Sequence, residues 1–347
     1  KSRLYGMIKE NFKRSVSRMN AFRSFQVIKE PVFHTAISDL PFTELAENEV
    51  LVKIAYSDVN YKDALAMSES GQVIRTYPMT PGIDLSGTVV QSNNPRFSKE
   101  DLVLATGFGL GVTHPGGYSQ YQKVPGDWLV PLPKNMTLRQ AMILGTAGFT
   151  AMLCVNALIR QGMTSDKKVV VTGASGGVGS TAIALLHKLG FQSIIAFSRK
   201  EESVTWLKSL GALQVVRPDE FLPETTKALG KQQIDYVIDT VCGEQLSSLL
   251  PLISYNGAVA LCGNAGGIKL NATVLPFILR NIQLIGIDSV NVPIDQRLSL
   301  WQQMADLQIA DELVVQEITL DQLPETASKL LAGTHQGRTL VNVGDHK

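Results

Sequence analysis

The chain has 347 residues, of which 44% are hydrophobic, and this length predicts two domains with a sizeable apolar core in each. Its 32 basic and 31 acidic residues leave a net charge of +1, which argues against nucleic acid or an anionic membrane as the main partner. No apolar run approaches the ~20 residues of a membrane span.

The cysteines and histidines indicate neither disulfides nor a metal site. Cys154, Cys242 and Cys262 are odd in number, widely spaced and set in apolar segments, which favours reduced thiols in a cytoplasmic protein. The five histidines are isolated, and no Cys-x-x-Cys pair occurs. We therefore expect no structural or catalytic metal.

Residues 1–18 are strongly basic and contain a single acid, Glu10. They have no apolar h-region, so they do not form a secretory signal. A basic amphipathic transit peptide is one interpretation. An extension before a start at Met19 is simpler, because patterned globular sequence begins at Phe22.

Residues 19–145 are punctuated by glycines and prolines and contain short strand-like stretches. These are Phe22–Ile28, Glu49–Tyr56, Gly87–Val90, Leu102–Ala105 and Tyr118–Val124. Many short strands separated by turn residues predict an irregular, β-rich, barrel-like domain. A broken helix is expected next, over Thr137–Ile159, where Thr137 and Gln140 have capping-box spacing and Gly145 and Gly148 interrupt the apolar face.

The stretch Val169–Ala182, VVVTGASGGVGSTA, predicts a strand, a tight turn and a helix. Aligned on Gly179, it is a dinucleotide-binding turn with Ala174 in place of the first glycine. Gly176 would let the backbone approach a pyrophosphate, and the helix that begins near Val178 would offer it free N–H groups. The alternative is an ordinary glycine-rich turn.

Two other nucleotide-binding loops are excluded by the residues. No Gly-Lys-Ser/Thr follows the glycines, so the turn is not a Walker-type P-loop. It resembles the loop of short-chain dehydrogenases, but that family carries the loop near the N-terminus and needs a Tyr-x-x-x-Lys pair downstream, which is absent here.

From this turn onward, strands and helices alternate. The expected strands are Val169–Thr172, Ser193–Ser198, Leu213–Val216, Ile234–Thr240, Gly257–Cys262 and Ile282–Ile287. With crossover helices they predict an α/β Rossmann domain, a doubly wound parallel sheet that spans residues 146–290 and binds its ligand at the carboxyl ends of the strands. Residues 291–347 read as helix, strand, helix and strand, with the last strand, Thr339–Val343, returning to the first domain.

The end of the second of these strands indicates which nucleotide binds. An NAD site usually has an acid there for the ribose hydroxyls, whereas this chain has Ser198, Arg199 and Lys200. A guanidinium and an ammonium would pair with a 2′-phosphate, which favours NADPH. The alternative is a solvated helix start in which Glu201 and Glu202 form the first turn.

Six strings closely resemble one zinc-free group of the medium-chain dehydrogenase/reductase superfamily. They are NYKDAL (60–65), PGID (81–84), GDW (126–128), GTAGFTA (145–151), PFILRN (276–281) and GRT (337–339). The group is the YhdH/AcuI-type acrylyl-CoA reductases, whose members also carry the name quinone oxidoreductase. The resemblance extends from about Met19 to Val343, and it implies a GroES-like barrel for the β-rich catalytic domain.

The resemblance also implies the site residues. Those implied to contact NADPH are Tyr61, Ser175, Gly176, Gly177, Val178, Ser198, Arg199, Lys200, Asn264, Ile278, Ser289 and Arg338. Thr146 would bond the nicotinamide carboxamide, although it could instead cap the broken helix. Tyr61 and Asp63 become the catalytic candidates. Without the resemblance they would be a packed aromatic and an exposed first-turn acid.

The expected activity is NADPH-dependent reduction of an activated carbon–carbon double bond, in acryloyl-CoA by resemblance, with a proton from Tyr61, Asp63 or water. Because the two side chains are two residues apart, they point about 200° apart on a regular helix. They could share a site only if Tyr61 lies in the incoming loop. Alternatives are an NADPH:quinone reductase and a nucleotide-binding protein without turnover. A homodimer is expected because the superfamily usually dimerises. A cytoplasmic location is expected because the cysteines read as reduced thiols.

Overall fold

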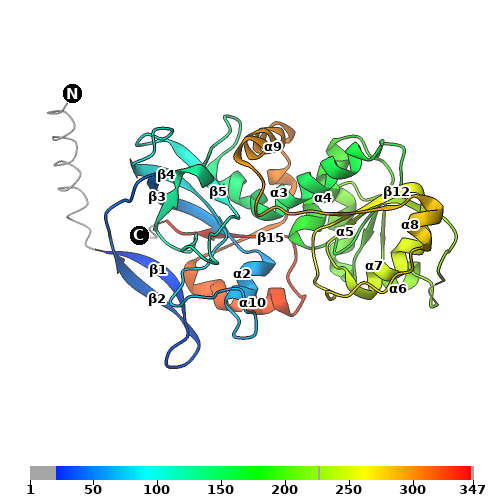
Figure 1. Cartoon of the computed structure of the whole chain (residues 1–347), viewed down its shortest axis with the longest axis horizontal. Helices are drawn as coiled ribbons and strands as arrows, with labels where there is room; N and C mark the ends of the chain where they lie inside the picture. Colours follow the sequence, from blue (N-terminus) through cyan, green and yellow to red (C-terminus); the bar gives the residue numbers. More distant parts are fainter. Residues whose placement is uncertain (1–20, 226, 345–347) are drawn as a thin grey trace.

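The computed structural model describes residues 21–225 and 227–344, so the predicted extension, residues 1–18, lies outside the described residues. Figure 1 shows a β-rich half and an α/β half, with the long helix α3 between them. The expected combination of a β-rich domain and a parallel doubly wound sheet is confirmed.

The β-rich half contains two sheets. A seven-stranded sheet has the order β14-β15-β3-β4-β5-β7, with β6 paired to β3. Its strands are β3 (Glu49–Asp58), β4 (Asp84–Ser92), β5 (Leu102–Thr106), β6 (Tyr121–Pro125), β7 (Val130–Pro131), β14 (Val315–Ile318) and β15 (Arg338–Asn342). The second sheet pairs β1 (Ala21–Ile28) with β2 (His34–Pro41). Strand β2 was not predicted from the sequence, because it has no buried residue to create an apolar alternation and, in the described residues, its pairing is with β1.

The α/β half has a six-stranded parallel sheet in the order β10-β9-β8-β11-β12-β13, the strand order of a dinucleotide-binding fold. The strands are β8 (Val169–Val171), β9 (Ile194–Phe197), β10 (Gln214–Val216), β11 (Ile234–Asp239), β12 (Ile253–Leu261) and β13 (Gln283–Gly286). The helices are α4 (Gly177–Lys188), α5 (Val204–Ser209), α6 (Pro218–Phe221), α7 (Gly243–Leu249) and α8 (Leu275–Arg280). All six expected strands are present.

Helix α3 (Leu138–Arg160) joins the two halves and is kinked at Gly145, as expected. Thr137 caps it, and the predicted capping box with Gln140 is formed. By length and composition α3 could cross a membrane. The expectation from the sequence, that no apolar run approaches the length of a membrane span, is therefore wrong for this helix. Most of it (83% of the apolar window) is buried inside the protein, so α3 is a core helix.

The C-terminal segment returns to the β-rich half. It contains α9 (Ile294–Leu307), β14, α10 (Leu323–Leu331) and β15. Strand β15 pairs antiparallel with β3, which sets Leu340 opposite Asp58. Figure 1 shows β15 within the β-rich half, beginning near the junction with the α/β half. The chain therefore brings residues from its end beside the last residues of β3. The remaining helices are α2 (Tyr61–Ala66) and the short η1 (Gly126–Trp128), η2 (Glu201–Ser203), η3 (Leu250–Leu252), η4 (Ala310–Glu312) and η5 (Leu320–Gln322).

Candidate functional site

Most of the segments predicted to bind the cofactor follow carboxyl ends of strands in the parallel sheet. The loop with Ser175 and Gly176 follows β8, and Ser198 to Lys200 follow β9. Asn264 follows β12 and Ser289 follows β13. Carboxyl ends of parallel strands lie at one edge of a sheet, which is where this fold binds its ligand.

The glycine loop has the backbone geometry that a pyrophosphate requires. Gly176 is the N-cap of α4, and a Cβ there would meet only the carbonyl oxygen of Gly173, at 3.2 Å, so no side chain fills the space beside it. A Cβ at Gly179 would lie 2.5 Å from that same oxygen, so only glycine lets α4 approach the loop this closely. Gly173 itself has a φ of +56°, which favours glycine. These residues fit a dinucleotide.

The basic residues after β9 face the C-terminal segment. The ammonium of Lys200 donates a hydrogen bond to the carbonyl oxygen of His335. The guanidinium of the exposed Arg199 comes within 4.0 Å of the position of a Cβ at Gly333. Burial, reinforced by Arg199, lowers the pKa of Lys200, while Glu202 opposes this change. A phosphate beside these two cations would therefore relieve a local excess of positive charge.

A buried network of polar side chains lies where β3 and β4 meet the kink of α3. The amide nitrogen of Asn60 donates to Asp58 Oδ1 at 2.7 Å and to Asp84 Oδ2 at 2.9 Å. Thr146 donates to Asp84 twice, from its backbone N–H at 2.7 Å and from its hydroxyl at 2.6 Å. The hydroxyl proton of Thr146 is thus committed to Asp84, so Thr146 can meet a carboxamide only as an acceptor.

Arg338 joins this network to the start of α4. Its side chain is buried and forms an ion pair with Asp58, and its Nε donates to the carbonyl oxygen of Ile143 at 2.7 Å. Its Nη1 would lie 2.9 Å from a Cβ at Gly177, and the backbone N–H of the preceding residue, Gly337, donates to the carbonyl oxygen of Ser175. The arginine therefore contacts the predicted cofactor loop and the β-rich half at once.

The pKa of Asp58 is raised well above its usual value. Burial is the largest cause, the neighbouring Asp84 carboxylate adds to it, and the positive charge of Arg338 opposes it. Asp58, Asp84 and Asp63 are all fully buried. One guanidinium thus faces a cluster of three buried carboxyl groups, and burial beside Asp84 favours retention of a proton on Asp58.

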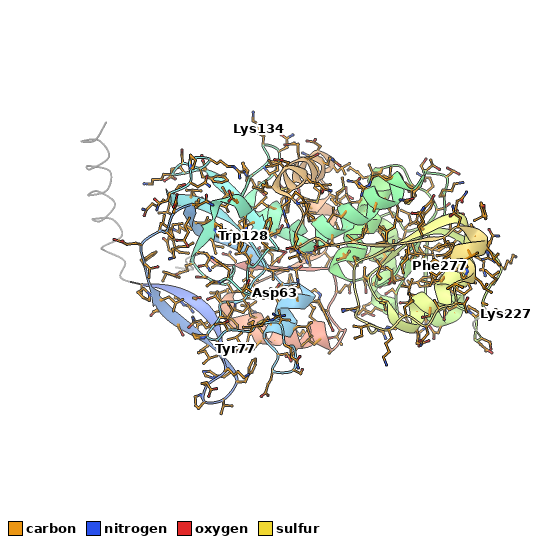
Figure 2. The ribbon with its side chains drawn as sticks, viewed as in Figure 1. Asp63, Tyr77, Trp128, Lys134, Lys227 and Phe277 are labelled. Carbon is orange, nitrogen blue, oxygen red and sulfur yellow. The ribbon has the colours of Figure 1, made fainter. Side chains whose placement is uncertain are left out.

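The two catalytic candidates have very different surroundings. Tyr61 is the first residue of α2 and does not lie in the loop before it, so the condition for a shared site is not met. Its side chain is 39% exposed, and its hydroxyl makes no hydrogen bond within the described part of the chain. Asp63 is completely buried, so the alternative interpretation, an exposed first-turn acid, is wrong. Figure 2 places Asp63 in the middle of the molecule.

Asp63 holds the backbone on both sides of the network. Its Oδ2 accepts from the N–H of Asn60 and its Oδ1 from the N–H of Ile83, both at 2.9 Å. Burial, reinforced by the charge of Asp84, raises its pKa to about 7, although the two N–H groups lower it. No hydrogen bond joins it to Tyr61 in the described residues, so any effect on Tyr61 passes through the start of α2.

Ile278 is not brought to this junction. It lies on α8 and is 70% exposed, and Figure 2 shows its neighbour Phe277 far to the right of Trp128 and Asp63, in the α/β half. Asn264 is exposed beyond β12, and Ser289 is half-buried with its carbonyl oxygen bound to Arg297. The predicted contact of Ile278 with the nicotinamide is therefore not supported by the arrangement of one chain.

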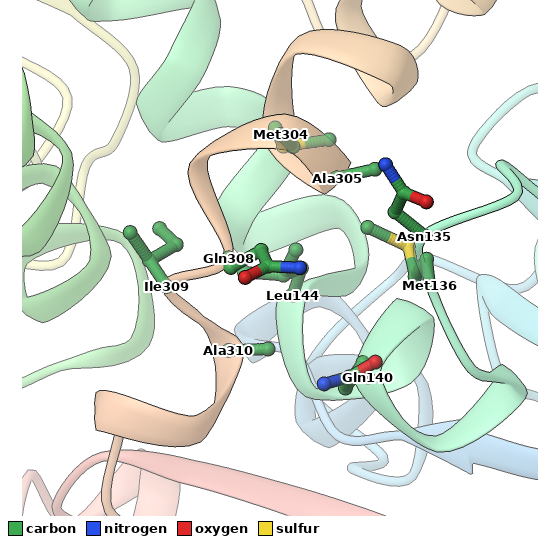
Figure 3. Close-up of a pocket in the computed structure, with 9 residues that line it drawn as sticks. All are labelled: Asn135, Met136, Gln140, Leu144, Met304, Ala305, Gln308, Ile309 and Ala310. Carbon is green, nitrogen blue, oxygen red and sulfur yellow. The ribbon is translucent and has the colours of Figure 1, made fainter.

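The described cavities lie away from this junction. A crevice between the start of α3 and the end of α9 holds about 10 Å³, which is room for one water molecule (Figure 3). A larger one, of about 310 Å³, is lined by Lys168, Ser193 and Gln233, which precede β8, β9 and β11. It therefore lies at the amino ends of the strands, opposite the edge where a dinucleotide binds.

Sequence reasoning missed Asp58, Asn60 and Asp84 as site residues. Asp58 ends an apolar strand and Asp84 begins the next one. An acid inside an otherwise buried strand is unusual and must be paired, so each was a detectable signal. That these acids share one cluster with Arg338, some 280 residues later, depends on the pairing of β15 with β3.

Comparison with known families supports the fold assigned to each half of the chain. Residues 46–134 match the family described as "Alcohol dehydrogenase GroES-like domain", and residues 177–307 match "Zinc-binding dehydrogenase". The second description names zinc, but over residues 21–225 and 227–344 no three or more His, Cys, Asp or Glu side chains are grouped to hold a metal ion. The residues described here do not fit a zinc site.

Three proteins are similar over most of their lengths. An acrylyl-CoA reductase AcuI of Ruegeria pomeroyi is 44% identical over 311 residues, 89% of this chain and 94% of its own length. The Bacillus subtilis protein YhfP, provisionally named a quinone oxidoreductase, is 46% identical over 304 residues, 86% of this chain and 92% of its own. Its crystal structure with NAD bound has a TM-score of 0.89, covering 93% of this chain and 99% of that one. The YhdH oxidoreductase of Salmonella enterica, solved with NADP, is 44% identical, with a TM-score of 0.88 over 93% of this chain and 100% of its own.

Proposed function

Since the chain belongs to the medium-chain dehydrogenase/reductase superfamily, in the family of AcuI, YhdH and YhfP, we propose that it reduces the carbon–carbon double bond of acryloyl-CoA with NADPH. That it is a nicotinamide-dependent oxidoreductase follows from the family. The choice of acceptor, the preference for NADPH and the roles of single residues are the proposal.

The described residues fit NADPH along one edge of the sheet. The loop of Ser175 and Gly176 and the first turn of α4 would hold the pyrophosphate. Ser198, Arg199 and Lys200 would hold the 2′-phosphate. Thr146, Ser289 and Asn264 are proposed for the nicotinamide end. When bound, NADPH supplies the hydride that reaches the β-carbon of the enoyl thioester.

The observation that carries the mechanism is the uncommitted hydroxyl of Tyr61. Asn60 and Thr146 already donate to buried carboxylates, whereas the exposed Tyr61, which follows Asn60 in the chain, has no hydrogen-bond partner among residues 21–225 and 227–344. As the thioester oxygen gains negative charge, Tyr61 Oη donates a hydrogen bond to it. The proton that completes the reduction reaches the α-carbon from Tyr61 or from water.

Asp63 is proposed to position other residues and not to donate the proton to the substrate. Both its oxygens are occupied by backbone N–H groups, and the side chain has no exposed surface. We assign it the role of a positioning residue, which fixes the start of α2 and thereby the direction of Tyr61. Because its pKa is raised to about 7, it also holds an exchangeable proton near neutral pH.

Reduction of a quinone is the second candidate, and the name of YhfP supports it. A planar acceptor needs an aromatic surface to stack on. Phe108 is stacked on Trp128, with ring centroids 5.5 Å apart, and Arg297 lies over the Phe108 ring at 4.3 Å. These contacts occupy the Phe108 ring, which makes it a poor platform for a quinone and favours the enoyl thioester.

A homodimer is proposed from the edge of the parallel sheet. Strand β13 ends the sheet, so one side of its backbone is unpaired within the part of the chain that the structure describes. Beside it α8 exposes Ile278 and Leu279, and Ile268 and Val274 are exposed before it. A second copy of the chain would cover these apolar side chains. We also propose a cytoplasmic location, which the free thiols of all three cysteines support.

The experiment that tests the proposal is a comparison of NADPH oxidation with acryloyl-CoA, with 1,4-benzoquinone and with no acceptor. We expect acryloyl-CoA to give the highest kcat/KM and propanoyl-CoA as product. A higher kcat/KM with the quinone would transfer the assignment to the second candidate. Oxidation no faster with either acceptor than with none would refute both.

A further inference from the structure

Arg297, on α9, is a buried arginine whose hydrogen bonds within the described residues all go to carbonyl and hydroxyl oxygens. It is 1% exposed, and no ion pair links it to an acid in the described residues. Its guanidinium lies between two aromatic rings, 4.3 Å from the centroid of Phe108 and 4.9 Å from that of Phe149. Burial lowers its pKa to about 10, although the charges of Asp84 and Asp288 oppose this change, so the group stays charged at neutral pH.

The guanidinium fastens the segment that follows β13. Its Nη2 donates to the carbonyl oxygens of Ser289 at 2.9 Å and Val290 at 2.8 Å, and its Nε donates to that of Val292 at 3.0 Å. Its Nη1 reaches the β-rich half, where it donates to the hydroxyl of Thr106 at 2.8 Å. One side chain therefore holds residues 289–292 against β5.

The same segment is bonded directly to the turn after β5. The carbonyl oxygen of Val290 also accepts from the N–H of Phe108 at 3.1 Å. A Cβ at Gly107 would lie 3.2 Å from Val290 and 3.3 Å from Arg297, and Gly107 has a φ of +73°. The two segments are packed so closely that only glycine fits between them without adjustment.

This contact leads to the start of α2. The N–H of Gly107 donates to the carbonyl oxygen of Ile83 at 2.9 Å, and the N–H of Ile83 donates to Asp63. Asp63 in turn accepts from the N–H of Asn60, which precedes Tyr61. A continuous set of hydrogen bonds thus connects the segment held by Arg297 with the residue we propose to act on the substrate.

We propose that Arg297 is a positioning residue for hydride transfer, which holds the segment 289–292 from the nucleotide half against the β-rich half. In doing so it fixes Ser289, which we propose to lie at the nicotinamide end of the cofactor, relative to Asp63 and the start of α2, which position Tyr61. A buried charge that is not directly paired with a carboxylate costs stability compared with an apolar side chain. Its retention is explained if several carbonyl groups must be held in one geometry, which the planar guanidinium does better than an ammonium or an apolar chain. The inference depends on the proposed reductase activity, but it does not depend on which acceptor is reduced.

The test compares Arg297→Met with Arg280→Met. Arg280 is a matched control, because it also donates to several carbonyl oxygens, those of Pro251, Ile253 and Gly230, but lies at the end of α8. The measurements are kcat with the best acceptor, the isotope effect with NADPH deuterated at C4, and the dissociation constant of NADPH from its fluorescence. They are normalised to NADPH-binding sites, so unfolded protein does not contribute.

We expect Arg297→Met to lower kcat at least tenfold and to increase the isotope effect, while the NADPH dissociation constant changes less than threefold. Arg280→Met should keep kcat within twofold of the parent. Parent kcat and isotope effect in Arg297→Met would overturn the proposal and leave Arg297 a purely structural residue. Should the Met variant not fold, Arg297→Lys decides in the same way, since it keeps the charge and loses most of the hydrogen bonds.

A readout without any acceptor separates this inference from the proposed function. Amide hydrogen exchange at Phe108 and Gly107 should accelerate at least tenfold in Arg297→Lys and remain at the parent rate in Arg280→Met. If neither acceptor is reduced but exchange accelerates, the proposed function fails, whereas the inference that Arg297 holds residues 289–292 against β5 stands. Unchanged exchange together with unchanged kcat in the Arg297 variants would refute the inference that Arg297 holds residues 289–292 against β5.

Discussion

Gly145 in α3 is packed directly against Asp58 at the end of β3. A Cβ added at Gly145 would lie 1.8 Å from Asp58 Oδ2 and 2.8 Å from Asp84 Oδ2. The residue also has a φ of +50°, which interrupts the helix and turns the N–H of Thr146 toward Asp84. The kink of α3 and the buried carboxylates thus depend on the absence of one side chain.

Gly145→Ala is expected to destabilise the protein by about 3 kcal/mol or more, because the positive φ and the contact with a fixed carboxylate both oppose a methyl group. Gly190→Ala provides the control. Gly190 has a φ of +90° and nothing within 4 Å of its Cβ position, so only the backbone term of about 1 kcal/mol applies. Urea unfolding of both variants measures the difference, and equal losses would contradict the contact with Asp58.

The kink shows how far sequence reasoning could go. Helical spacing, the capping box and two internal glycines were sufficient to predict a broken helix over Thr137–Ile159. The reason for the break could not be predicted, because it lies in Asp58 and Asp84, which come from strands 60 to 90 residues earlier in the chain. Local patterns report periodicity and turns, whereas a buried cluster is created by tertiary pairing.

The C-terminal residues illustrate the same limit. The alternation of short segments predicted the last strand, but not that Leu340 faces Asp58. Arg338 was therefore assigned only through the resemblance, and Arg297, in the first turn of an amphipathic helix, gave no signal at all. Tyr61 and Asp63 were singled out from the sequence together, but only the structure separates an exposed hydroxyl from a buried carboxyl.

The stability of the protein should report the unusual pKa of Asp63. Because burial raises this pKa to about 7, the group contributes stability that is fully present below the unfolded pKa of 3.8 and is lost as the pH rises through about 7. The free energy of unfolding of the parent, minus that of Asp63→Asn, should fall between pH 4 and 7 by at most ~1.4 kcal/mol per pH unit and level off above pH 8. A difference that is constant with pH would show that Asp63 is ionised throughout.

Cofactor selectivity should depend on Arg199. If its guanidinium pairs with the 2′-phosphate, Arg199→Ala loses a charge-assisted hydrogen bond of about 1.5 to 3 kcal/mol and the KM for NADPH rises accordingly. The KM for NADH should barely change, since NADH has no phosphate there. Lys208→Ala, an exposed lysine on α5, is the control. Equal effects of Arg199→Ala on both cofactors would show that Arg199 does not recognise the phosphate.

Tyr61→Phe removes the hydroxyl that we propose as donor to the thioester oxygen. If that bond strengthens in the transition state, kcat and kcat/KM with acryloyl-CoA should fall together by roughly 10² to 10³. Any quinone activity should be largely kept, because a quinone needs no proton at carbon. Tyr255→Phe, 63% exposed on β12, controls for the loss of a phenol. Parent rates with acryloyl-CoA in Tyr61→Phe would mean that the hydroxyl has no part in the reaction.

The most direct test of the account follows the label from NADPH deuterated at both C4 positions into the product of acryloyl-CoA reduction. Mass spectrometry and NMR of the product should show propanoyl-CoA with one deuterium at the β-carbon, and in heavy water with unlabelled NADPH one deuterium at the α-carbon. Propanoyl-CoA without deuterium from the labelled cofactor, or with that deuterium at the α-carbon, would contradict hydride transfer to the β-carbon and with it the proposed function.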